Sequence, residues 1–113
     1  QIISTDGVLE AKDFTLALAS QIENISPWGQ KFPEPKFYGE FFIKERYVVG
    51  ELHARLLLET DENVTNLSAI AFGAAKEDWF LNASRIKAVY HLVVNRYRGQ
   101  ETLQLKLDFA ERV

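Results

Sequence analysis

The chain has 113 residues, of which 47% are hydrophobic and 26% are charged, and its formal net charge is −3. This composition provides the core of one small domain, and no apolar run approaches the roughly 20 residues that span a bilayer. The absence of cysteine excludes a disulfide framework and a thiolate metal site. It also fits a protein of a reducing, cytoplasmic environment.

The N-terminal region predicts a short strand followed by a helix. Residues 1–5 are β-prone and end at the turn signal Asp6-Gly7. Within residues 12–25, apolar side chains recur at spacings of four, four and three, which is one face of an amphipathic helix. Pro27 ends this helix. Its apolar face needs a partner, which is either missing from the chain or is the domain that follows.

A rigid connector is predicted over residues 27–35, which read PWGQKFPEP and hold all three prolines of the chain. Each proline fixes its own φ and pushes the preceding residue toward extended geometry. Trp28 and Phe32 add large apolar anchors. We therefore interpret the segment as a packed joint and not as a flexible linker.

After the connector, the apolar periodicity changes to two, which predicts β-strands. The expected order is strands over 37–49, 52–59 and 67–72, a short helix over 74–81, and strands over 85–94 and 102–109. Five strands with a helix between the third and fourth indicate a mainly β OB-fold, a Greek-key barrel. The long first strand fits because it must bend to belong to both halves of the barrel. An open five-stranded sheet or an SH3-like barrel would leave that helix unexplained.

The sequence indicates no catalytic or metal site. His53 and His91 lie on different predicted strands, and no histidines and carboxylates have metal-ligand spacing. Phosphate-cradling glycine loops and serine or cysteine nucleophile signatures are also absent. We therefore expect neither an active site nor a cofactor in this chain.

Basic and aromatic residues instead predict a surface for single-stranded nucleic acid. An OB-fold binds single strands on the face of its second and third strands, between two hairpin loops. Such binding needs cations for phosphates and flat side chains for stacking, and the predicted loop over 95–100 contains both. The candidates are Lys44, Arg46 and Tyr47 near the end of the first strand, His53 and Arg55 on the second, and Asn95, Arg96, Tyr97 and Arg98 in the loop. The alternatives are an ordinary exposed strand face and a solvated hairpin whose tyrosine covers a barrel end.

The charge distribution argues against strong binding by this chain alone. Residues 1–40 hold six acidic and three basic side chains, whereas residues 41–113 hold ten of each. A stand-alone nucleic-acid binder is expected to carry a markedly basic patch. Binding would therefore depend on the local placement of bases or on a larger protein. The first residue is Gln and Met is absent, so we expect the chain to be a piece of a longer protein.

Several segments together resemble the C-terminal part of the RecJ family of bacterial 5′-to-3′ exonucleases specific for single-stranded DNA. They are PWGQKFPEP followed by FYGEF, then VVGELHARL, SAIAFG and VYHLVVNRYRGQETLQLKLDF. The resemblance implies that residues 1–26 are the end of a DHHA1 domain and residues 27–36 a connector. Residues 37–113 would be an OB-fold domain that helps to hold single-stranded DNA during repair and recombination.

The resemblance also implies which features lie elsewhere in the parent protein. The family's DHH metal motifs and the Gly-Gly-His motif of DHHA1 do not occur here, so hydrolysis with Mn²⁺ or Mg²⁺ would belong to an upstream region. The implied partners are single-stranded DNA, the remainder of the nuclease core and the single-strand-binding protein. The alternative is a structural or protein-interaction module that supports the core or docks a partner. Candidate DNA contacts carried over from the family are His53, Arg55, Asn95, Tyr97, Arg98 and Gln104.

Overall fold

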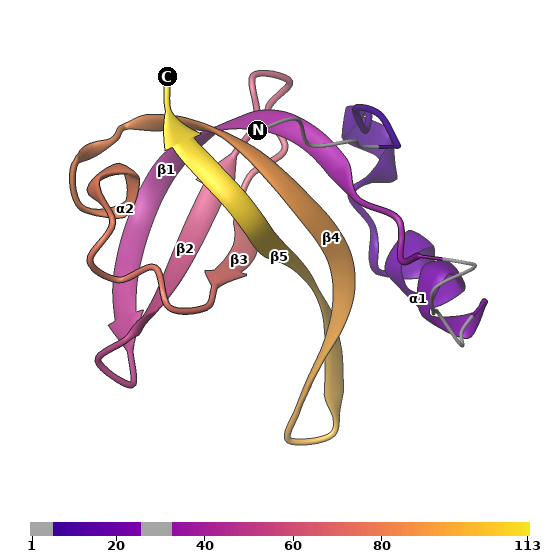
Figure 1. The fold of residues 1–113 in the computed structure, drawn as a ribbon. Coiled ribbons are helices and arrows are strands. Elements are labelled where there is room, and N and C mark those ends of the chain that lie inside the picture. Colours follow the sequence, from indigo (N-terminus) through magenta and orange to yellow (C-terminus); the bar gives the residue numbers. More distant parts are fainter. Residues whose placement is uncertain (1–5, 26–32) are drawn as a thin grey trace.

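The computed structural model describes residues 6–25 and 33–113, which form a β-barrel with a helix beside it (Figure 1). The predicted strand over residues 1–5, and Trp28 and Phe32 of the predicted connector, lie outside the described residues. The elements are a 3-10 helix η1 (Ala11–Asp13), α1 (Leu16–Asn24), β1 (Phe37–Val49), β2 (His53–Glu59), β3 (Leu67–Ala71), α2 (Asp78–Asn82), β4 (Arg85–Tyr97) and β5 (Gln100–Arg112). This order confirms five strands with a short helix between the third and fourth.

The barrel closes in the order β1-β2-β3-β5-β4, which confirms the OB-like fold. Neighbouring strands are antiparallel, except that β3 and β5 pair in parallel around Ala69 and Leu105. The first half of β1 pairs with β4 and its second half with β2, and the register shifts between Ile43 and Glu45. Such a bulge bends a strand. The first strand therefore serves both halves of the barrel, as its length predicts.

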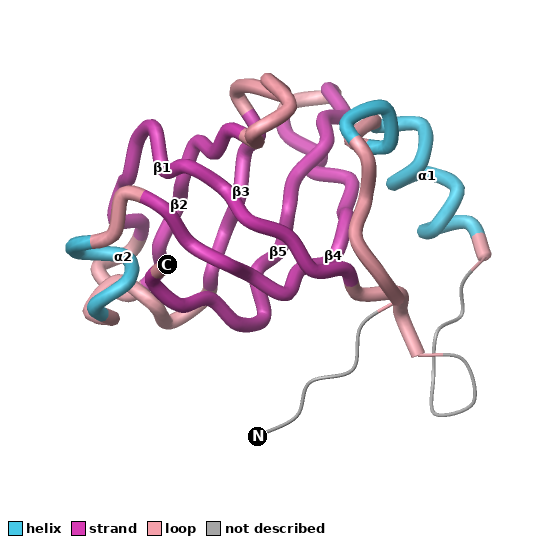
Figure 2. The backbone as a smooth tube through the Cα atoms, turned by 90° about the horizontal axis from the view of Figure 1, so that it is seen from above, coloured by secondary structure: helices cyan, strands magenta, loops and turns pink. Residues whose placement is uncertain are grey.

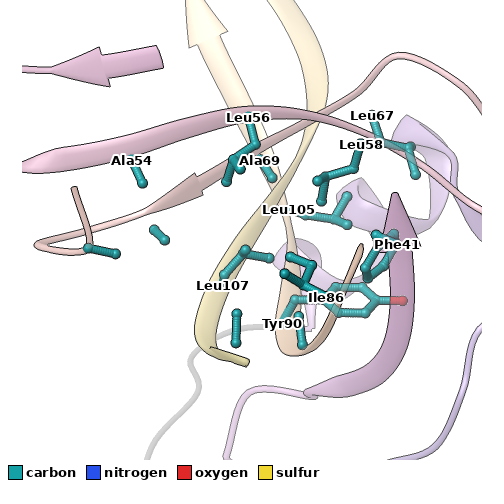
Figure 3. Close-up of a cluster of buried hydrophobic side chains, with 14 of the residues drawn as sticks. Phe41, Ala54, Leu56, Leu58, Leu67, Ala69, Ile86, Tyr90, Leu105 and Leu107 are labelled. Atoms are coloured by element: carbon teal, nitrogen blue, oxygen red, sulfur yellow. The ribbon is translucent and has the colours of Figure 1, made fainter. Parts of the chain in front are cut away.

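The core consists of the inward side chains of the strands (Figure 3). In β2, the alternate residues Ala54, Leu56 and Leu58 are completely buried, as the period of two predicts. Trp79 and Phe80 of α2 are also buried and lie edge to face, with ring centroids 6.0 Å apart. This short helix therefore packs against the barrel and contributes to its core.

Helix α1 packs on the barrel, mainly against β4 (Figure 2). Ala19 and Ile22 are its buried residues. The helix begins later than the periodicity predicts, because Thr15 is its N-cap and accepts a hydrogen bond from the backbone N–H of Leu18 at 3.1 Å. The partner of its apolar face is therefore the β-barrel that follows it in the chain.

The last hairpin differs from the prediction. The sequence predicts a loop over residues 95–100, but β4 continues to Tyr97 and β5 begins at Gln100. Only Arg98 and Gly99 form the turn, and their φ values of 50° and 76° are typical of a type I′ hairpin turn. The strands are hidden in the sequence because this arm is exposed on both faces. An apolar alternation cannot mark a strand that buries neither face.

Arg46 of β1 caps the C-terminal end of α2. Its guanidinium donates hydrogen bonds to the backbone carbonyl oxygens of Phe80 at 3.1 Å, of Leu81 at 3.2 Å, and of Ala83. The last carbonyls of a helix have no partner within the helix, and the helix dipole attracts a cation there. Because a helix this short is not stable alone, the cap holds α2 in place.

Tyr90 of β4 places a hydroxyl in the barrel without a hydrogen-bond partner among the described residues. The side chain is completely buried, and the Phe41 ring lies edge-on to it at 5.4 Å (Figure 3). The Phe14 ring stacks on it at 6.2 Å. Burial raises the pKa of Tyr90, so the group remains a neutral phenol. The aromatic cluster therefore owes its stability to packing and not to this hydroxyl.

We predict that Tyr90→Phe leaves the free energy of unfolding unchanged or raises it by up to about 1 kcal/mol, because an unpartnered buried hydroxyl costs free energy. Tyr90→Ala should lower it by about 3–5 kcal/mol through the cavity it creates. Urea denaturation followed by circular dichroism measures both changes. A clear loss of stability in Tyr90→Phe would show that the hydroxyl is satisfied and would contradict this description.

We predict that Arg46→Ala lowers the free energy of unfolding by about 1–2 kcal/mol, because it removes hydrogen bonds from a charged donor. Lys44→Ala is a matched control on the same strand. Its ammonium lies 4.0 Å from the Glu59 carboxylate and is largely exposed, so its removal should cost less than about 0.5 kcal/mol. The same denaturation experiment compares the two, and equal losses would argue against the cap.

Candidate nucleic-acid interface

A groove of about 580 Å³ lies between the β4–β5 hairpin and the outer face of the neighbouring strands. In Figure 1, the β1–β2 and β4–β5 turns project from the same end of the barrel. Among the described lining residues there is no carboxylate. The lining consists of Arg55, Ser68, Asn95, Tyr97, Arg98, Gln100, Thr102 and Gln104.

Strand alternation determines which side chains face this groove. In β2, Arg55 is exposed between the buried residues Ala54 and Leu56. Ser68 of β3 lies between the buried residues Leu67 and Ala69, and Gln104 of β5 lies between the partly buried Leu103 and the buried Leu105. The same burial that forms the core therefore directs these polar groups outward.

The floor of the groove crosses the point where the barrel closes. The Gln104 side chain donates a hydrogen bond from Nε2 to Ser68 Oγ at 3.3 Å, which joins β5 to β3. This contact orients both side chains and still leaves each with further donors and acceptors. The floor can therefore hydrogen-bond a ligand without moving its own groups.

An exposed cation and aromatic ring form the tip of the hairpin. The Arg98 guanidinium carbon lies 5.1 Å from the centroid of the Tyr97 ring, and 64% of Tyr97 is exposed. Guanidinium groups and aromatic rings of this kind contact phosphates and stack on bases. The tip therefore combines the two functions that binding to a single strand requires.

A second aromatic residue adjoins the groove through Arg55. The Arg55 guanidinium carbon lies 5.6 Å from the centroid of the Tyr47 ring, its cross-strand neighbour on β1. Tyr47 donates a hydrogen bond from its hydroxyl to Glu45, and this contact raises the pKa of Tyr47. The ring is 42% exposed, so it extends the aromatic surface beyond the groove lining.

The two arginines of the groove differ from Arg85, Arg96 and Arg112 in their ionic contacts. In the described parts of the chain, the arginines in ion pairs are Arg85, Arg96 and Arg112. Arg55 and Arg98 take part in none of these pairs. Neither guanidinium is therefore held in a direct ion pair with a described carboxylate.

Half of the ten candidates from the sequence come together in this groove, and a sixth, Tyr47, adjoins it. Those that line it are Arg55, Asn95, Tyr97, Arg98 and Gln104. They come from three strands and the turn between the last two. The groove therefore gathers candidates that are up to 49 residues apart in the sequence.

His53 and Lys44 lie outside the groove lining. The backbone N–H of Gly73 donates to His53 Nδ1 at 2.9 Å, and the Phe72 ring lies edge-on to the imidazole at 5.3 Å. The Lys44 ammonium lies 4.0 Å from Glu59. Both side chains thus have neighbours that do not belong to the groove.

The other two arginine candidates bind groups of the protein itself. Arg46 caps α2, as described above. Arg96 donates hydrogen bonds to Glu23 and Glu101, and the bond from Arg96 lowers the pKa of Glu23. The alternation of β4 separates Arg96 from its neighbours Asn95 and Tyr97, which line the groove.

The lining residues Ser68, Gln100 and Thr102 are not among the sequence candidates. Thr102 could have been found, because it shares the polar face of the last strand with Gln104. Ser68 could not, because the pairing of β3 with β5 joins strands that are far apart in the sequence. Gln100 lies in the segment over residues 95–100, which the sequence predicts to be a loop.

A metal site is not formed by the residues at 6–25 and 33–113, which contain no group of three or more His, Asp or Glu placed to hold an ion. The helices in these ranges are also too short and too polar to cross a membrane.

Comparisons with known proteins agree with the fold. A model of the RecJ OB domain family matches residues 5–108. The chain is 36% identical over 115 residues to the single-stranded-DNA-specific exonuclease RecJ of Haemophilus influenzae, covering 99% of this chain and 20% of the relative. With the Escherichia coli protein of the same name it shares 34% identity over 107 residues, covering 94% and 18%.

A solved structure has the same architecture. The crystal structure of RecJ in complex with Mn²⁺ from Thermus thermophilus matches with a TM-score of 0.75 at 16% identity, covering 98% of this chain and 16% of that one. The chain thus spans about a fifth of the length of the curated relatives it matches. From the family match and these relatives, the chain belongs to the RecJ OB domain family.

Proposed function

We propose that this chain is the single-stranded-DNA-holding OB-fold portion of a RecJ-like 5′-to-3′ exonuclease. The observation that carries the proposal is the convergence of Arg55, Tyr97 and Arg98 on one groove. The relatives are named as exonucleases specific for single-stranded DNA, and a groove of this kind fits that substrate. It offers cations for the backbone and a ring for the bases, and its described lining presents no carboxylate to repel phosphates.

The chemistry of the groove suits an unpaired strand. Single-stranded DNA exposes both its phosphates and the faces of its bases, and every base has a face that can stack. Arg55 and Arg98 would contact phosphates, while Tyr97 stacks on a base. Ser68 and Gln104 on the floor would hydrogen-bond the edges of bases or the sugar. Such a grip tolerates many sequences, as an exonuclease needs.

The charge of the chain sets the expected strength of binding. For single strands, the logarithm of the affinity falls with the logarithm of the salt concentration with a slope of about −0.7 per phosphate contact. Two groove arginines therefore imply a slope of about −1.4 and modest affinity. Residues 41–113 hold equal numbers of acidic and basic side chains, so long-range attraction adds little. Firm binding would require the rest of the parent protein.

The proposal places hydrolysis outside this chain. The parent would be a cytoplasmic enzyme of DNA repair and recombination whose metal site, with Mn²⁺ or Mg²⁺, lies upstream. Solved RecJ structures from Thermus thermophilus contain Mn²⁺ or Mg²⁺. Residues 1–26 would end the preceding DHHA1 domain, residues 27–36 would connect it, and residues 37–113 would hold the strand. The nuclease core and the single-strand-binding protein would be its partners.

We predict that this chain binds fluorescently labelled oligo-dT at low salt, as measured by fluorescence anisotropy, and that binding weakens as salt is added. Tyr97→Ala should weaken it about tenfold, because stacking on one base is worth about 1–3 kcal/mol. Arg98→Ala should weaken it and reduce the salt slope by about 0.7.

Arg112→Ala is the matched control, because Arg112 is exposed, pairs with Asp78 and lies outside the groove lining. We expect it to change affinity less than twofold. No binding at low salt with protein near millimolar concentration would reject the proposal for this chain. Equal losses in Arg98→Ala and Arg112→Ala would show that only net charge matters, and a role as a supporting module would then be favoured.

A further inference from the structure

A bidentate ion pair connects α1 to the β4–β5 hairpin. Arg96 donates from Nη1 to Glu23 Oε1 and from Nη2 to Glu23 Oε2, both at 2.8 Å. Its third donor, Nε, bonds Glu101 Oε2 on the facing strand at 2.9 Å. This fork-to-fork geometry fixes the orientation of the guanidinium as well as its distance. Arg96 thus links the helix to both strands of the hairpin.

The position of Glu23 shows that this link is not a by-product of local structure. Glu23 is the last residue but one of α1, where the partial negative charge of the helix end disfavours a carboxylate. Its partner Arg96 is 73 residues away in the sequence. The ion pair with Arg96 therefore offsets the unfavourable placement of a carboxylate at the helix end. This is expected of a tertiary contact that is maintained by selection.

The hairpin arm has little else to hold it. From Asn95 to Thr102 every residue is exposed, and the last side chains packed against the core are Val94 and Leu103. A two-stranded hairpin that buries neither face is at best marginally stable. The direction of the arm therefore depends on its contact with α1.

We propose that Glu23 is a positioning residue: through Arg96 it holds the hairpin arm so that Tyr97 and Arg98 face the groove. The inference rests on the proposed function for its effect on DNA. Arg96 and Tyr97 are consecutive in β4, so their side chains face opposite sides of the hairpin. The contact that holds Arg96 against α1 therefore turns Tyr97 toward the groove and the DNA. The placement of α1 thus sets the grip on DNA, and a shift of that helix would loosen it.

The test uses a variant for which electrostatics and positioning predict opposite changes in DNA affinity. Glu23→Gln removes a negative charge, so simple electrostatics predicts tighter binding of oligo-dT. Loss of positioning predicts weaker binding instead, by about three- to fivefold. Glu62→Gln makes the same change on an exposed loop carboxylate and should leave affinity the same or slightly higher.

Hydrogen exchange without DNA gives an independent readout. In Glu23→Gln, amides of residues 95–102 should exchange faster while those of β2 and β3 do not change. Unchanged exchange in the arm, or tighter DNA binding in Glu23→Gln, would overturn the inference. The proposed function would survive that result if Arg98→Ala still weakened binding. If the chain bound no DNA at all, the proposed function would fail, and exchange would still decide whether Glu23 holds the arm.

Discussion

The short parallel pairing of β3 with β5 is the contact on which the rest of the structure depends. It turns a run of antiparallel hairpins into a closed barrel, and closure decides which faces are buried. It also brings Ser68 beside Gln104, although these residues are 36 positions apart. Closure of the barrel therefore forms the core and the groove floor together, because the alternation of β5 points Leu105 inward and Gln104 outward.

The sequence predicts those parts of the fold that bury one face. The apolar period of two predicts a strand over residues 52–59, and β2 forms at His53–Glu59 with Ala54, Leu56 and Leu58 buried on one face. The hairpin arm escaped prediction because it buries neither face. Arg46 and Arg96 show the same limit for the site. A basic residue on a strand carries no local sign of whether it will meet a phosphate, a helix end or a distant carboxylate.

The placement of charges explains how a chain with net charge −3 can present a positive groove. Arg85, Arg96 and Arg112 are paired with carboxylates on other elements, so many acidic groups lie where they neutralise structural cations. Arg55 and Arg98 face a groove whose described lining has no acid. A negative net charge thus conceals a local excess of positive charge in the groove. This excess acts only at short range, because salt screens charges over longer distances.

The turn at the hairpin tip has a consequence for how this domain could evolve. The first position of a type I′ turn favours Asn, Asp or Gly, yet here it is Arg98 with a φ of 50°. A left-handed conformation costs an ordinary side chain about 1 kcal/mol. Asn or Gly would relieve that strain and make the domain more stable, but would remove the guanidinium from the groove. Stability and the proposed binding of DNA are thus in conflict at this residue, and selection for thermal stability alone would discard the arginine.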